Sequence, residues 1–220
     1  LHSLRRRQRQ MCIRDRLLNL IEYPPRKLEK IVVLTGSSEG TSKRRIGRHD
    51  WATTAAMWNI PKEGFRKLYE QIPGEKPPPE EAWSTTGGNP RYLSILCQNK
   101  WKTQDIIREI AERRSLRDFI SKLTTYQRKT LTESIEDPDA LLQALSKAPT
   151  KNQKEEAATL INSLIELNMI TYTIPPREKH LWIDTPPPEK DPKLGIGKHA
   201  AWQTPLHKQA AKTALNQLQK

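Results

Sequence analysis

The sequence predicts a mainly α-helical protein that starts with the end of an α/β core and closes with a small β-hairpin. Residues 31–34 (Ile-Val-Val-Leu) form a continuous aliphatic run, which is typical of a strand buried on both faces of a parallel sheet. Residues 61–148 instead combine helical spacing of apolar side chains with capping residues and prolines. The strongest amphipathic pattern, at 154–168, runs into the alternating residues 170–174, which predicts a helix followed by a strand.

The helices of the middle region are predicted from their start and stop signals. A helix over 65–72 is expected to follow Pro61, and the proline-rich residues 73–79 predict a semi-rigid linker. Asn89 as N-cap and Pro90 at the first helical position predict a helix over 90–101. Further helices are expected at 104–113 behind Thr103, from 116 behind a capping box at Ser115, at 125–134, and at 138–148 behind Asp137.

Three short helices followed by a hairpin is the element order of a winged helix. We expect the strand at 170–174 to turn at 175–179 and to return at 180–183. The glycines of 195–198 (Gly-Ile-Gly-Lys) lack the spacing and the following Ser or Thr of a phosphate loop, which predicts a flexible turn. Thr204 and Pro205 predict the start of a final helix.

Composition limits the classes of partner. The net charge is +13, of which residues 1–16 contribute +5 and the rest of the chain +8. A basic surface favours nucleic acid or another anionic partner, although a solvated basic face gives the same composition. The two cysteines, Cys12 and Cys97, are too few for a disulfide framework or a zinc site, which fits a reducing, cytoplasmic compartment. The five histidines show no metal spacing, so no metal ligands are predicted, and no long apolar run predicts a membrane span.

The first sixteen residues differ from the rest of the chain. They contain six arginines and show neither helical nor strand periodicity. A basic arm for nucleic acid, a targeting segment and a translated sequencing adapter are the three interpretations. We favour the adapter, so that 1–16 would be non-native or disordered.

The residues Thr86-Gly87-Gly88-Asn89-Pro90-Arg91-Tyr92-Leu93 resemble the lid motif of archaeal P-loop ATPases, relatives of the AAA+ and STAND groups. The residues 195–207, which end in Gln203-Thr204-Pro205-Leu206-His207, resemble the tail of the same family. A phosphate loop of the form G-x-x-x-x-G-K-[ST] does not occur in these 220 residues. The resemblance therefore implies the C-terminal part of such an ATPase, with the end of the P-loop core at 17–60, a helical lid at 61–120, and a winged helix with a tail helix at 121–220.

The resemblance also implies the positions of functional residues. The polar residues after the strand 31–34 resemble the family's sensor strand, and a Gly-Arg pair follows near the lid. A polar turn and a solvated loop arginine are the alternatives at these two places. The implied catalytic residues are Thr35, Ser37 and Arg48. The residues implied near the adenine are Gly87, Gly88, Asn89 and Pro90.

By this resemblance the intact protein would bind ATP and magnesium and couple hydrolysis to movement of the lid and winged helix. This chain, without a phosphate loop, is not expected to hydrolyse ATP or to bind it tightly. The alternative is a stand-alone basic winged-helix protein that binds DNA. A third interpretation is a purely structural module that contacts a protein partner or oligomerises. The residues that would contact nucleic acid are unknown from sequence.

Overall fold

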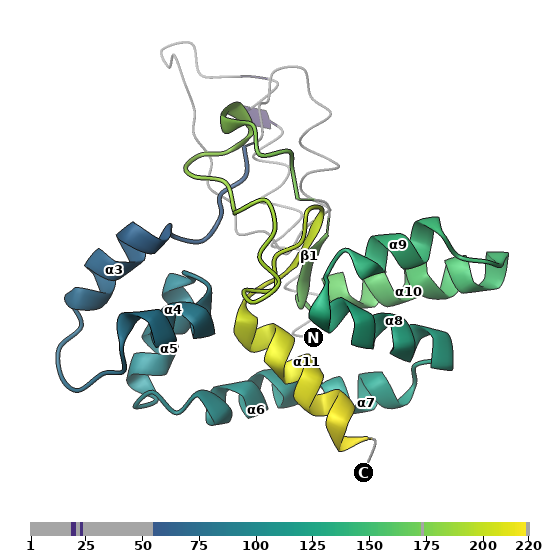
Figure 1. The fold of residues 1–220 in the computed structure, drawn as a ribbon, viewed down its shortest axis with the longest axis horizontal. Helices are drawn as coiled ribbons and strands as arrows, with labels where there is room; N and C mark the ends of the chain where they lie inside the picture. Colours follow the sequence, from purple (N-terminus) through teal and green to yellow (C-terminus); the bar gives the residue numbers. More distant parts are fainter. Residues whose placement is uncertain (1–18, 21–22, 24–54, 173, 219–220) are drawn as a thin grey trace. The chain divides into compact units, whose positions relative to one another are not determined.

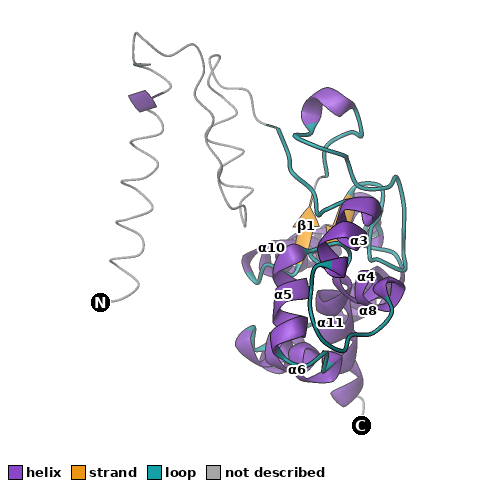
Figure 2. Ribbon diagram, turned by 90° about the vertical axis from the view of Figure 1, so that its left-hand side faces the viewer, coloured by secondary structure: helices purple, strands orange, loops and turns teal. Residues whose placement is uncertain are grey.

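Helices follow one another through the part of the chain that the computed structural model describes, which is residues 19–20, 23, 55–172 and 174–218. Figure 2 shows that helices make up most of these residues and that the two short strands lie together. The mainly helical prediction is therefore confirmed, as is a small antiparallel pair of strands. The elements are α3 (Lys62–Glu70), α4 (Pro79–Thr86), α5 (Pro90–Gln98), α6 (Thr103–Arg113), α7 (Leu116–Ser121), α8 (Thr125–Glu136), α9 (Ala140–Ser146), α10 (Lys151–Glu166), β1 (Ile170–Tyr172), the 3-10 helix η1 (Lys179–Leu181), β2 (Ala200–Trp202) and α11 (Pro205–Gln217).

The chain divides into two units, residues 1–55 and 56–220. Most of the first unit lies outside the described residues. The predicted strand at 31–34 and the implied catalytic residues Thr35, Ser37 and Arg48 lie there too.

The second unit is built around α11. This helix packs against α4, α6, α7 and α8, and it runs diagonally through the group of helices in Figure 1. Its alanines at 210, 211 and 214 are at most 2% exposed, so neighbouring helices approach it closely. The core around it is aliphatic apart from Trp202 of β2, whose indole N–H donates to the carbonyl of Ser134 at 3.0 Å.

The order α8, α9, α10, β1, β2 contains one correction to the predicted hairpin. β1 pairs with β2 at 200–202, with Ile170 opposite Trp202, and not with 180–183. The residues 179–181 form η1, and Trp182 makes a parallel bridge to Ala56 instead. Of the apolar residues in 180–183, only Trp182 is buried, packed against Leu194, Ile196 and Ala201, whereas Ile183 is 54% exposed.

The capping residues explain which of the other predicted helix boundaries are correct. Thr124 and Gln127 form a capping box at α8, and Asn89 caps α5 as predicted. The capping box predicted at Ser115 is wrong, because this residue has a left-handed φ of 49° and its side chain makes no cap bond. Asp137 ends α8 and accepts a hydrogen bond from the backbone N–H of Asp139, so α9 begins later than predicted.

Two further differences arise because prolines and threonines begin helices in more than one way. Pro79 lies in the predicted linker at 73–79, but it is the first residue of α4, a helix that the sequence signals do not predict. Thr103 is the first residue of α6 and not its cap.

Candidate functional site

The turn between α4 and α5 brings together the four residues implied to lie near the adenine. Gly87 and Gly88 have φ values of 61° and 78°, which residues with a side chain rarely adopt. Both glycines are buried, whereas Asn89 is half-buried and Pro90 is exposed. A ligand at this turn therefore meets Asn89 and Pro90, while the glycines face the protein interior. We name Gly87 to Pro90 the glycine turn.

Close packing explains why both buried positions are glycine. A Cβ atom at position 87 would lie 2.9 Å from Cδ of Pro205, the first residue of α11. A Cβ atom at position 88 would lie 2.8 Å from Cζ3 of Trp83 and would also overlap the carbonyl oxygen of Ile60. The glycine turn is thus wedged between α4, α11 and the segment before α3.

Hydrogen bonds fix the polar side of the glycine turn. The side-chain oxygen of Asn89 accepts from the backbone N–H of Tyr92 at 3.1 Å, which is the N-cap of α5. The side-chain amide of Asn89 donates to the side-chain oxygen of Asn59 at 3.0 Å. The backbone N–H of Ile60 donates to the carbonyl of Gly88 at 3.1 Å. The orientation of the Asn89 side chain is therefore set from two directions.

A polar cluster of two buried and two half-buried residues lies next to the glycine turn, around the buried His207 of α11. The Nε2 atom of His207 lies 2.9 Å from Nη2 of Arg114 and 3.2 Å from the hydroxyl of Tyr92. Its Nδ1 atom lies 2.8 Å from the hydroxyl of Thr204. Because a guanidinium only donates, Nε2 must accept and the proton of the neutral ring belongs on Nδ1, from which it donates to Thr204. The rings of Tyr92 and His207 meet edge to face, with centroids 5.1 Å apart.

Burial and neighbouring positive charge keep His207 neutral. The residue is 1% exposed, and this desolvation, together with Arg114 and Arg91, lowers its pKa from 6.5 to about 3. At neutral pH the imidazole therefore keeps a single tautomer and a fixed acceptor for Arg114. This arrangement suits orientation of the helices better than proton transfer, because the ring does not titrate near pH 7.

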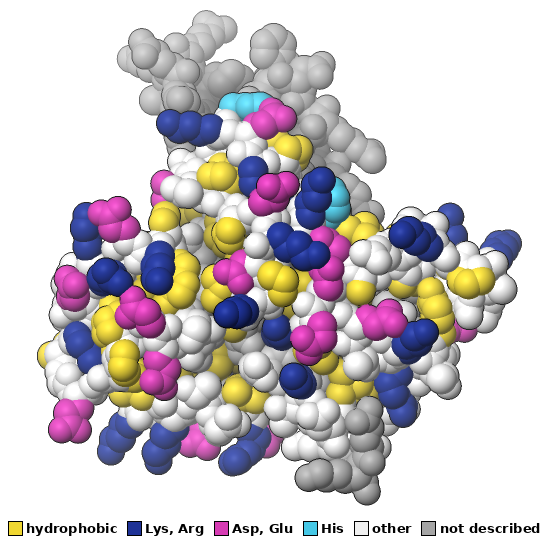
Figure 3. Space-filling model, viewed as in Figure 1, with side chains coloured by type: hydrophobic (Ala, Val, Ile, Leu, Met, Phe, Trp, Pro, Cys, Tyr) yellow, Lys and Arg dark blue, Asp and Glu magenta, His cyan; other side chains and the backbone are white. Residues whose placement is uncertain are grey.

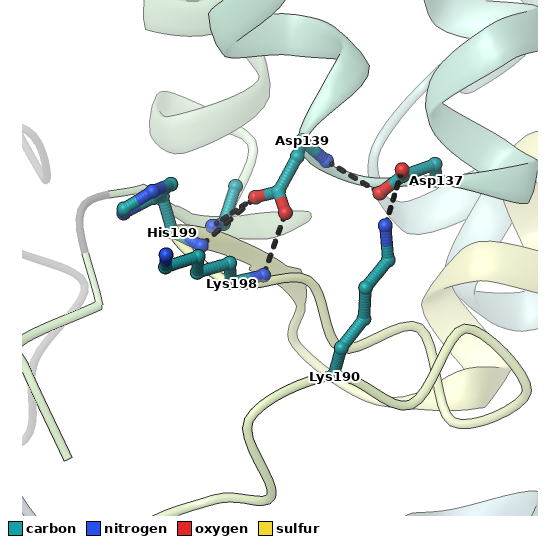
Figure 4. Close-up of polar contacts among 6 residues, drawn as sticks. Asp137, Asp139, Lys190, Lys198 and His199 are labelled. Atoms are coloured by element: carbon teal, nitrogen blue, oxygen red, sulfur yellow. Dashed lines mark hydrogen bonds and ion pairs between the residues drawn. The ribbon is translucent and has the colours of Figure 1, made fainter.

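A second polar site holds residues 197–200, which overlap the flexible turn predicted at 195–198. The carboxylate of Asp139 accepts hydrogen bonds from three successive backbone N–H groups, of Lys198 at 2.6 Å, His199 at 2.8 Å and Ala200 at 3.1 Å (Figure 4). A Cβ atom at position 197 would lie 2.7 Å from this carboxylate. The predicted flexible turn is therefore an anchored loop, whose amides hold an internal anion.

Charge and burial act in opposite directions on Asp139. Burial raises the pKa of its carboxyl, but the three backbone N–H groups outweigh this effect and the pKa is lowered. The guanidinium of Arg177 donates to the carbonyls of Gly197 at 3.0 Å and Lys198 at 2.6 Å from the other side of the loop. Both the donors and the acceptors of this loop thus have partners within the protein.

The surface carries no concentrated charge of one sign on the face shown in Figure 3, where basic and acidic side chains are interspersed. On α10, the exposed charged residues Lys151, Lys154, Glu155 and Glu166 balance one another. Among the described residues, no group of His, Cys, Asp and Glu is placed to hold a metal ion. Within the same residues, the helices are too short or too polar to cross a membrane.

Four members of this site are not predicted from the sequence: Asn59, Tyr92, Arg114 and His207. Tyr92 and His207 did lie within the motifs that carried the family resemblance, which was the available signal. Their contact joins positions 115 residues apart, and local patterns do not reveal such contacts.

Comparison with known proteins gives one family match, in the N-terminal part of the chain. Residues 6–96 match a family model described as an ATPase domain predominantly from Archaea. The match includes the glycine turn and most of α5. No curated protein and no solved structure matches the chain. Over residues 6–96, the chain is thus similar to archaeal ATPase domains.

Proposed function

We propose that the chain is the C-terminal part of a P-loop ATPase, and that the exposed side of the glycine turn lies near the adenine of ATP in the intact protein. The observation that carries this proposal is the match of residues 6–96 to archaeal ATPase domains, which spans the turn. The burial of the two glycines supports it, because it leaves Asn89 and Pro90 as the accessible members.

The catalytic roles in this proposal belong to the first unit. The hydroxyls of Thr35 and Ser37 would orient a water molecule or a phosphate oxygen, and Arg48 would stabilise the charge that develops on the terminal phosphate. ATP and magnesium would be held by a phosphate loop, a sequence that these 220 residues do not contain. The chain alone is therefore expected neither to bind ATP tightly nor to hydrolyse it.

The C-terminal elements would act as the moving partner of the lid at 61–120. The order α8, α9, α10, β1, β2 supports a winged helix in 121–220, in which a long connection from 173 to 199 takes the place of a short wing. In the intact ATPase, nucleotide binding and hydrolysis would change how this winged helix is held. A partner protein or a second copy of this chain would then respond to the changed position of the winged helix.

The test begins with the source DNA, sequenced in long reads across the codons for Arg16 and Leu17. The complete reading frame is then expressed, and ATP hydrolysis is measured for the wild type and for Pro90→Ala. Loss of the exposed proline at the adenine is expected to raise the KM for ATP with little change in kcat, because ground-state and transition-state binding weaken equally. Pro188→Ala, at an exposed proline of the 173–199 connection, is the matched control and should leave both constants unchanged.

Absence of a phosphate loop upstream, or equal KM values for the wild type and Pro90→Ala, would contradict this proposal. The alternative, a stand-alone DNA-binding winged helix, predicts that binding of the chain to duplex DNA weakens steeply as the salt concentration rises. The balanced charges on α10 argue against it.

A further inference from the structure

The proposed function gives no specific role to residues Gln203 to His207, the end of the stretch that resembles the family's tail. It joins β2 to α11, and all of its residues except Gln203 are fully buried. The polar atoms of a buried histidine and threonine need hydrogen-bond partners. The partners of these atoms therefore show which elements the segment is attached to. We name residues 203–207 the connecting segment.

The first end of the connecting segment is tied to β1. The backbone N–H of Gln203 donates to the carbonyl of Met169 at 2.9 Å. The side-chain amide of Gln203 donates to the hydroxyl of Thr171 at 3.1 Å and to the carbonyl of Ile170 at 3.3 Å. These bonds fix the connecting segment to the residues that follow α10.

The second end touches the glycine turn and α5. Pro205 lies so close to Gly87 that no side chain fits between them. Two residues later, His207 contacts Tyr92, which is the residue whose backbone N–H is capped by Asn89. The connecting segment therefore reaches the glycine turn from both of its flanks.

Arg114 closes the connection between the two ends. One of its guanidinium nitrogens, Nη2, reaches Nε2 of His207, and the other donates to the carbonyl of Leu167, the C-cap residue of α10. The position of His207 is thus linked to the end of α10 as well as to α5. An apolar side chain would fill the same space but would leave this guanidinium nitrogen without its acceptor.

We propose that the connecting segment, with Tyr92 and Arg114, positions the glycine turn relative to α10 and β1. A shift of the winged-helix elements then moves the surface formed by Asn89 and Pro90. This inference rests on the proposed function only in assigning that surface to the adenine; the mechanical link itself does not require a nucleotide. His207, Tyr92 and Arg114 are positioning residues in this scheme.

The experiment is hydrogen exchange on the 220-residue chain without nucleotide, read at the amides of Gly87, Asn89, Tyr92 and Leu93 and, for comparison, at those of Leu131 and Ile135 in α8. In His207→Leu, we expect exchange to accelerate over the wild type at both sets of amides. The acceleration at the glycine-turn amides should be at least tenfold larger than that at the α8 amides. His207→Gln, whose side-chain oxygen can still accept from Arg114, should restore most of the protection.

The matched control is Leu141→Ala, at a fully buried residue of α9 that lies in the same core but outside the connection. This variant should lower the stability of the protein without accelerating exchange at the glycine-turn amides more than at the α8 amides. Equal acceleration at both sets of amides in His207→Leu, or a glycine-turn response in Leu141→Ala as large as in His207→Leu, would overturn the proposal. If His207→Leu does not fold, Tyr92→Phe, which removes one hydroxyl, gives the same comparison with a smaller selective effect.

A second readout separates this inference from the proposed function. In the complete ATPase, His207→Leu should raise the KM for ATP at least threefold with little change in kcat, as Pro90→Ala does. Selective exchange without nucleotide supports the mechanical link even when the complete protein fails to bind ATP, a failure that would overturn only the adenine assignment.

Discussion

The glycine turn and the loop at 195–200 are alike in sequence and opposite in use. Each has two glycines beside polar residues, although neither has the full spacing of a phosphate loop. In the glycine turn the glycines are buried and the polar residue and proline are turned outward. In the other loop three backbone N–H groups already hold the carboxylate of Asp139. Backbone N–H groups of the glycine turn also have internal partners, since those of Gly87 and Asn89 donate to the carbonyls of Trp83 and Thr86. The two loops therefore differ in what they leave accessible, which is Asn89 and Pro90 in the glycine turn, and the presence of glycine alone does not distinguish them.

The largest expected effect is at the internal anion. Asp139→Ala removes three hydrogen bonds to a carboxylate, at about 1.5 kcal/mol each, and should lower the free energy of unfolding by about 4.5 kcal/mol. Urea denaturation of the variant and the wild type measures this. Asp118→Ala, at an exposed carboxylate that pairs with Lys122, is the control and should change stability little. A similar small loss in Asp139→Ala would mean that the loop at 195–200 does not depend on its internal anion.

The next effect distinguishes steric fit from backbone conformation in the glycine turn. Gly88→Ala should cost about 3 kcal/mol, because the left-handed conformation is unfavourable for alanine and the added carbon overlaps Trp83. Gly74 has a similar φ of 87°, but a Cβ atom there would meet nothing within 4 Å. Gly74→Ala should therefore cost only about 1 kcal/mol. Equal losses in the two variants, measured by thermal unfolding, would show that packing against the glycine turn is unimportant.

The stability of the protein is expected to depend on pH through His207, which contacts Tyr92 next to the glycine turn. Its pKa of about 3 in the folded protein is below 6.5, so between these values the unfolded chain binds a proton that the folded chain does not. Stability is therefore fully present above pH 6.5 and falls by about 1.4 kcal/mol per pH unit below it, or about 2 kcal/mol between pH 6.5 and 5. The lowered pKa of Asp139 adds a further loss at lower pH, as the pH falls through its folded value.

Urea denaturation at pH 6.5 and at pH 5 measures the histidine effect. In His207→Gln the difference between the two pH values should shrink by about 2 kcal/mol, because glutamine does not titrate. An unchanged difference would mean that His207 is protonated in the folded protein, with the Arg114 contact broken.

The smallest expected effect concerns the polar side of the glycine turn. Asn89→Ala removes the N-cap of α5 and should cost about 1 kcal/mol in thermal unfolding. Asn89→Asp keeps an oxygen for the N–H of Tyr92 but loses the donor to Asn59. If Asn89→Asp is as unstable as Asn89→Ala, the Asn59 bond contributes more than the cap does.

Sequence reasoning succeeded where the signal was local. The starts of α5 and α11 follow from Asn89 and from Thr204–Pro205, since capping residues and first-position prolines act within one turn of the helix. The predicted start of α8 at Thr125 is also confirmed. It failed where the determining partner is distant. The strand β2 was missed because Ala200 to Trp202 is recognisable only through its pairing with β1, 30 residues away.

The candidate site shows the same division. The resemblance implies that the two glycines, Asn89 and Pro90 lie near the adenine, which stays a prediction; in the structure these consecutive residues form one turn. The buried environment that sets their geometry was not predicted, because His207 and Arg114 reach it from other helices. The predicted roles of Thr35, Ser37 and Arg48 stay predictions, since these residues lie outside the described part of the chain.

The position of α11 has a consequence for synthesis on the ribosome. This helix follows every other described element in the chain, yet it packs against α4, α6, α7 and α8. Apolar faces of those helices therefore stay uncovered in the nascent chain until residues 205–217 emerge from the exit tunnel. A chaperone that shields apolar surface would be needed most during this interval, and a stalled or shortened translation product should aggregate although most of its helices are complete.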